Sequence, residues 1–140
     1  MRARTVQELV AAHEGLRLKP YKDSLGVLTI GYGRNLDAVG LRRNEAEIML
    51  GNDLRAARVS AQRYRWFDDL SPVRQAVVVD MHYQLGRSGF AAFTKTRAAI
   101  AASEWHTAAD EMVASRWHEQ TPTRCDRLAL MMADDRWPDA

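Results

Sequence analysis

Residues 13–33 read HEGLRLKPYKDSLGVLTIGYG, and this stretch decides the fold class. Pro20 and three glycines separate β-branched and aromatic residues, which predicts two or three short strands joined by tight turns. The clearest turn is expected at residues 23–26. No other part of the chain has a β-like pattern, so we expect an α+β protein with one small antiparallel sheet near the N-terminus.

The remainder of the sequence has helical periodicity and clear helix boundaries. Thr5 and Glu8 form a capping box before the first helix, and Gly15 ends it. Ser71-Pro72 is a strong helix start, and Gly86 suits a left-handed cap at the end of that helix. Further helices are expected at about residues 44–63, 94–103, 105–114 and 121–133.

Composition limits the classes of protein. The 140 residues correspond to one domain, and a net charge of +2 permits an anionic polymer as partner without requiring one. The single cysteine, Cys125, excludes an internal disulfide framework and a thiolate zinc cluster, and it is expected in the core. The four histidines lack metal-ligand spacing, so neither a metal nor another cofactor is expected.

Location and membrane contact follow from the apolar pattern. No apolar run approaches the ~20 residues of a membrane span, so membrane insertion is not expected. The N-terminal residues lack the continuous apolar region of a secretory signal. We therefore expect the protein in the cytoplasm of the cell that makes it.

Three polar residues of the decisive stretch could carry chemistry. Glu14 stands at the end of the first helix as a candidate proton donor, although an exposed helix-end glutamate is the simpler interpretation. Asp23 lies in a polar turn, where it could stay ionised or merely bind local backbone donors. Threonine is common in β-strands, so Thr29 could simply be a strand residue without a functional role. A proton-donating acid and an ionised carboxylate across a cleft are the groups that glycoside hydrolysis needs.

The stretch resembles the catalytic motif of phage-type lysozymes, the T-even phage endolysins, which are muramidases. The resemblance continues in residues 67–70 (FDDL), 81–86 (MHYQLG) and 115–124 (SRWHEQTPTR). It implies a lysozyme-like fold with an active-site cleft between a small lobe and a larger, mostly helical lobe. The implied single catalytic domain, 1–140, has a small lobe at about 14–45. Its helical lobe comprises about 46–140 plus the first helix, 5–13.

The resemblance also implies roles for the three polar residues. Glu14 matches the general acid, Asp23 matches the carboxylate that assists water attack, and Thr29 matches the threonine that holds the water. Members of this kind invert the anomeric centre. The implied substrate is the β-1,4 bond between N-acetylmuramic acid and N-acetylglucosamine in peptidoglycan.

Further positions match the family outside these three. Arg124 matches an arginine that pairs with the catalytic glutamate and contributes to substrate binding. Arg34 stands where a histidine is common, and an Arg34–Asp68 pair is expected as a structural substitute. The other expected substrate-binding residues are Tyr32, Gln84, Trp117 and Gln120.

Alternative functions stay open on the sequence. A non-catalytic glycan-binding module would keep the cleft without turnover, and a lytic transglycosylase would need only the glutamate and release anhydro sugars. A nucleic-acid binder is disfavoured because the cations are spread along the chain. The resemblance implies a monomer that needs a holin-type membrane hole to reach the wall.

Overall fold

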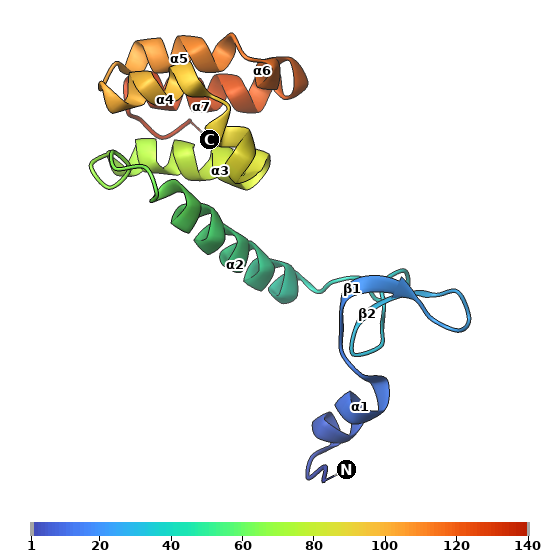
Figure 1. Ribbon diagram of the computed structural model, residues 1–140. Coiled ribbons are helices and arrows are strands. Elements are labelled where there is room, and N and C mark those ends of the chain that lie inside the picture. Colours follow the sequence, from blue (N-terminus) through green and yellow to red (C-terminus); the bar gives the residue numbers. More distant parts are fainter. Residues whose placement is uncertain (1, 140) are drawn as a thin grey trace. The chain divides into compact units, whose positions relative to one another are not determined.

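The computed structural model describes residues 2–139, which fall into two compact units, Met1–Met49 and Leu50–Ala140 (Figure 1). Helix α2 (Arg43–Ala61) is continuous across residues 49 and 50, where the units meet in sequence. The predicted α+β fold, with a small sheet and a mostly helical remainder, is confirmed.

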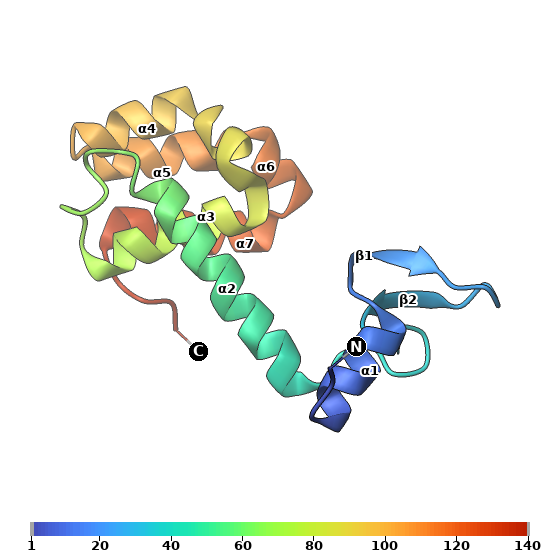
Figure 2. The same cartoon turned by 60° about the horizontal axis from the view of Figure 1, so that its bottom comes forward.

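The first unit contains helix α1 (Val6–Glu14) and a three-stranded antiparallel sheet. Its strands, in spatial order, are β1 (Arg17–Lys22), β2 (Leu28–Gly31) and β3 (Arg34–Asn35). Figure 2 shows β1 and β2 running side by side as a hairpin. The predicted strands and the turn between them are therefore present in the sequence stretch that indicated them.

The start of α1 is close to the predicted capping box. Thr5 Oγ1 accepts the N–H of Glu8 at 3.1 Å, as expected. The Glu8 carboxylate, however, accepts the N–H of Arg4 at 2.7 Å, one residue before the predicted donor. Both side chains still satisfy backbone donors that the first helical turn leaves free.

The second unit consists of helices that surround one apolar core. After the end of α2 come α3 (Pro72–Ala91), α4 (Thr94–Ala101), α5 (Trp105–Val113), α6 (Arg116–Gln120) and α7 (Pro122–Asp134). Helix α5 packs against both α4 and α7. The largest fully buried side chains are Phe67, Met81, Phe90, Ile100, Met112 and Met132.

Two helix predictions need correction. Gly86 has the expected positive φ of 74°, but the chain returns to helical geometry after it and α3 continues to Ala91. Residues 116–120, which lie between two predicted helices, form the short helix α6 after Ser115. Cys125 is buried within α7, as expected.

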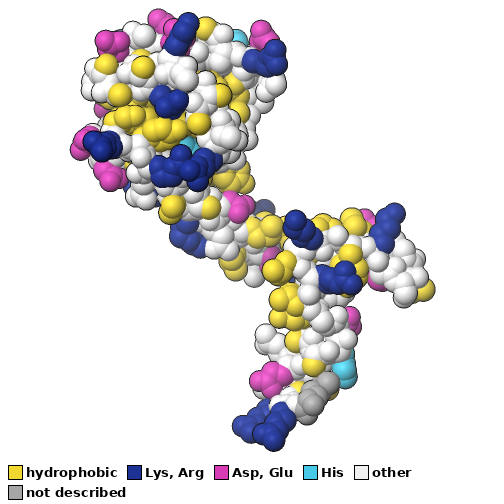
Figure 3. Space-filling model, in the orientation of Figure 1, with side chains coloured by type: hydrophobic (Ala, Val, Ile, Leu, Met, Phe, Trp, Pro, Cys, Tyr) yellow, Lys and Arg dark blue, Asp and Glu magenta, His cyan; other side chains and the backbone are white. Residues whose placement is uncertain are grey.

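The two units differ in burial. Every buried hydrophobic residue belongs to the second unit, between Ala57 and Met132, whereas Thr29 is the one fully buried residue described in the first unit. Val6 and Leu18 of the first unit are exposed. Figure 3 shows apolar side chains at the surface of the molecule. The first helix was predicted to pack with the helical lobe, but that packing concerns the relation between the units and stays a prediction.

No helix within residues 2–139 is both long and apolar enough to cross a bilayer.

Candidate active site

The Glu14 side chain lies against Gly33. Glu14 is the last residue of α1, and its side chain reaches Gly33, two residues beyond the end of β2. A Cβ at Gly33 would come within 2.8 Å of Glu14 Cδ and closer still to Oε2. Gly33 also has φ +75°, a conformation that favours glycine. The absence of a side chain at Gly33 therefore makes room for the Glu14 carboxyl group.

Asp23 occupies the turn between β1 and β2, and the turn binds one of its two carboxylate oxygens. Oδ1 accepts the backbone N–H groups of Leu25 and Val27, both at 2.9 Å. The Asp23 N–H donates to the Val27 carbonyl at 3.0 Å and closes the turn. Within the described residues Oδ2 accepts no hydrogen bond. The carboxylate is thus fixed in orientation with one oxygen left over.

Thr29 lies on β2 with its hydroxyl group fixed in direction. The residue is 4% exposed, and Oγ1 donates to the Val27 carbonyl at 2.8 Å. Tyr21 and Thr29 are cross-strand partners, and Asp23 bonds to Val27 one step nearer the turn. Asp23 and Thr29 are therefore diagonal neighbours on one face of the hairpin, a position that separates Cα atoms by roughly 7–8 Å.

In the second unit, the structure connects Gln84, Trp117 and Thr121. The Gln84 carbonyl oxygen accepts the indole N–H of Trp117 at 2.9 Å, and its amide donates to Thr121 Oγ1 at 3.1 Å. Trp117 is buried and meets the ring of Phe93 edge-on, with centroids 5.9 Å apart. Gln84 is thereby held in one orientation by two partners from another part of the fold.

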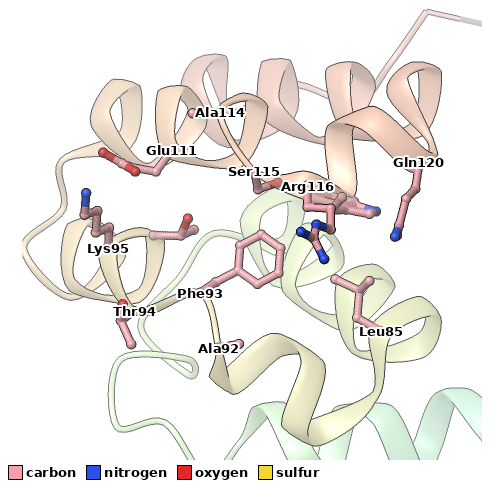
Figure 4. A pocket seen from close by; sticks show the side chains of 12 residues that line it. Leu85, Ala92, Phe93, Thr94, Lys95, Glu111, Ala114, Ser115, Arg116 and Gln120 are labelled. Carbon is pink, nitrogen blue, oxygen red and sulfur yellow. The ribbon is translucent and has the colours of Figure 1, made fainter.

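Trp117 and Gln120 line a pocket of about 450 Å³ whose walls come from α3, α4, α5 and α6 (Figure 4). Phe93 and Leu85 supply apolar wall, while Lys95 carries a charge at its rim. Phe93 and Lys95 were not predicted from the sequence. Leu85 and Arg116 were not predicted as site residues either, although they lie in the matching segments 81–86 and 115–124.

Arg34 has a partner that the sequence analysis did not identify. Its guanidinium group binds the Glu45 carboxylate through two contacts, at 2.5 and 2.6 Å, and links β3 to α2. The hydrogen bond from Arg34, aided by the Arg42 N–H, lowers the pKa of Glu45 to about 2. The structural role expected of Arg34 is thus performed with Glu45, and its pairing with Asp68 of the other unit stays a prediction.

Arg124 likewise has a partner within its own unit. Its Nε and Nη2 atoms donate to Asp80 Oδ1 at 2.8 and 2.6 Å, which links α7 to α3. The implied pairing of Arg124 with Glu14 joins residues of different units and stays a prediction. Tyr32 is about half exposed and lines a hollow beside α1 together with Val6 and Val10.

No cluster of three metal-ligating side chains occurs within residues 2–139. Glu14, Asp23, Thr29 and Gln84 carry carboxyl, hydroxyl and amide groups, which can exchange protons or form hydrogen bonds with sugars.

Comparison with known proteins decides the family. The family model described as phage lysozyme matches residues 11–129, a range that includes Glu14, Asp23 and Thr29. The chain belongs to the phage lysozyme family. Two phage lysozyme relatives from Dictyostelium discoideum, named probable T4-type lysozyme 1 and 2, are each 25% identical over 154 residues. Each alignment covers 89% of this chain and 91% of the relative.

Membership of the phage lysozyme family establishes the reaction class. The chain is a glycoside hydrolase, and its substrate is peptidoglycan. The resemblance stated from the sequence is therefore confirmed, together with the fold class that it implied.

Proposed function

We propose that this phage lysozyme is an endolysin-type muramidase that cleaves the β-1,4 bond between N-acetylmuramic acid and N-acetylglucosamine and so lyses bacteria. Glu14 is its general acid, and Asp23 and Thr29 hold and activate the attacking water. One observation carries this assignment: Asp23 has one oxygen bound by two backbone N–H groups and the other free. The two N–H bonds keep the carboxylate in one orientation, and its free oxygen can accept a proton from water.

The proposed reaction is a single displacement. The oxygen of water forms a bond to the anomeric carbon while the bond from that carbon to the glycosidic oxygen breaks. The glycosidic oxygen leaves with the bonding electron pair and takes the proton of Glu14. One proton of the water passes to Asp23. Because the water attacks the face of the anomeric carbon opposite the leaving oxygen, the product has the inverted configuration. Inverting glycoside hydrolases generally use two carboxyl groups, one as general acid and one as general base.

Substrate contacts are part of the same proposal. Gln84, Trp117 and Gln120 contact the glycan, with Trp117 forming apolar wall and Gln84 supplying fixed polar groups. Tyr32 and Arg124 complete the set. The support is the hydrogen-bond network that fixes Gln84 and the pocket that Trp117 and Gln120 share.

We also propose that the enzyme acts as a monomer, accumulates in the cytoplasm of the producing cell and reaches the wall through a holin-type membrane hole. Release of the enzyme into the medium without such a hole would contradict this route.

The catalytic assignment is tested with Glu14→Gln and Asp23→Asn on purified peptidoglycan. Removal of a general acid or base lowers rates by about 10²–10⁴-fold, and we expect losses in this range for both variants with unchanged melting temperatures. Glu47→Gln, which alters an exposed glutamate of α2, is the matched control and should keep full activity.

Product analysis separates the reaction types. Hydrolysis gives reducing N-acetylmuramic acid ends, whereas a lytic transglycosylase gives anhydro ends. Anhydro products alone would overturn the hydrolase proposal. Binding without turnover in the wild-type enzyme would favour a glycan-binding module.

A further inference from the structure

Asp23, the proposed base, and Thr29, whose hydroxyl group is proposed to hold the water, both form hydrogen bonds with the backbone of Val27. Its N–H donates to Asp23 Oδ1 at 2.9 Å, and its carbonyl accepts the Thr29 hydroxyl at 2.8 Å. The same carbonyl accepts the Asp23 N–H at 3.0 Å. Val27 thereby binds both side chains, with one hydrogen bond to each, and a third bond joins its carbonyl to the backbone of Asp23.

These bonds determine which atoms remain available to water. The proton of the Thr29 hydroxyl points at the Val27 carbonyl, so toward any water the hydroxyl oxygen can only accept. Asp23 Oδ1 is occupied by two N–H donors, so its acceptor toward water is Oδ2. Both side chains therefore present acceptors and neither presents a donor.

The geometry points to Val27 as a positioning residue for the attacking water, an inference that rests on the proposed function. One water proton binds Asp23 Oδ2 and the other binds Thr29 Oγ1. With both protons held, the water can direct only its lone pairs at the anomeric carbon. As the oxygen bonds to that carbon, the first proton passes to Oδ2, while the second stays on the new hydroxyl group.

The backbone of Val27 carries this role, whereas its side chain is only partly buried. Val27→Pro removes the N–H and retains the carbonyl, while Val27→Ala retains both groups and shortens only the side chain. A displacement of about 1 Å in a reacting group costs about 100-fold in rate. We therefore expect Val27→Pro to lower kcat about 100-fold with KM nearly unchanged, and Val27→Ala to keep kcat within about twofold.

A second measurement on the wild-type enzyme is independent of whether Val27→Pro folds. Scalar coupling across a hydrogen bond, measured by NMR, should connect the amide nitrogen of Val27 with the side-chain carboxyl carbon of Asp23. Slow exchange of the Thr29 hydroxyl proton should accompany it. Absence of the coupling would overturn the inference, as would wild-type kcat in a folded Val27→Pro variant.

Different experimental results would contradict the proposed function and the role of Val27. If Asp23→Asn is fully active, the proposed function itself is wrong. If Asp23→Asn is inactive but Val27→Pro keeps its kcat, only the role of Val27 is wrong. An equal loss of kcat in Val27→Ala would also overturn the inference, because the side chain and not the backbone would then be responsible.

Discussion

The Glu14 carboxyl group packs directly on the Cα of Gly33. A Cβ at Gly33 would lie within 2.8 Å of Glu14 Cδ and 3.2 Å of Cγ, so the two positions cannot both carry unperturbed side chains. This contact joins the end of α1 to the segment after β2. The contact explains why the residue at position 33 is a glycine.

We predict that Gly33→Ala lowers activity on peptidoglycan about 100-fold. The added methyl group displaces the carboxyl group of Glu14, and misplacement of a reacting group by about 1 Å has a cost of this size. Steady-state kinetics on purified peptidoglycan measure the effect.

Gly40→Ala is the matched control for this variant. Gly40 also has a positive φ, +59°, but a Cβ there meets only the Leu36 carbonyl oxygen at 3.7 Å. Both variants bear the left-handed strain of about 1–2 kcal/mol, whereas only Gly33→Ala disturbs Glu14. Equal activity losses in the two variants would show that backbone strain, and not the displaced carboxyl group, is responsible.

We predict that Glu45→Gln lowers the melting temperature modestly and changes its pH dependence. Arg34 holds the pKa of Glu45 at about 2, below its ordinary value of 4.5. The stabilisation is therefore fully present above about pH 4.5 and is lost as the pH falls toward 2. Melting curves of wild type and variant should differ by a constant amount above pH 5 and converge toward pH 2. A gap that does not depend on pH would contradict this account.

Local patterns in the sequence predicted the hairpin well. The turn at residues 23–26 needs only short-range hydrogen bonds that Asp23 accepts and a positive φ at Gly26. Aspartate and glycine at these positions are clear signals of a turn in the sequence. The start of α3 at Ser71 is equally local, since Ser71 Oγ accepts the Arg74 N–H three residues on.

The partners of charged side chains were not predictable in the same way. Arg34 binds Glu45, eleven residues away, and Arg124 binds Asp80, forty-four residues away. Such pairs depend on how helices and strands pack. The sequence alone does not show which carboxylate an arginine will bind, because all arginines of the chain have the same side-chain chemistry. The pocket around Phe93 was missed for the same reason, because its walls come from four helices.

We predict that His82 makes the second unit sensitive to acid. Its ring is 4% exposed against Phe90, and Nδ1 binds the Val78 carbonyl at 2.8 Å. Within the described residues Nε2 is buried without a partner. Burial lowers the pKa of His82, the bond to Val78 opposes this, and the charge of Arg63 adds to the lowering.

The lowered pKa of His82 determines the direction in which stability changes with pH. Below about pH 6.5 the unfolded chain takes up a proton that the folded ring resists, so stability is lost as the pH falls. Replacing His82 with Phe removes this proton uptake, so the melting temperature of wild type should fall relative to His82→Phe between pH 7.5 and pH 5. A constant difference over that range would show that His82 does not titrate on unfolding.

We predict that Gln84 acts on substrate binding through Trp117. Gln84→Ala leaves the buried indole N–H of Trp117 without its acceptor, which costs about 1–3 kcal/mol of stability. Because Gln84 is proposed to contact the glycan and not the reacting bond, KM should rise several-fold while kcat changes little. Gln84→Glu keeps an acceptor for Trp117, and Thr121 Oγ1 can turn to donate to it, so this variant should recover stability. If Gln84→Ala instead lowers kcat with KM unchanged, Gln84 belongs to the catalytic step and the proposed division between the binding residues and the Glu14–Asp23–Thr29 set is wrong.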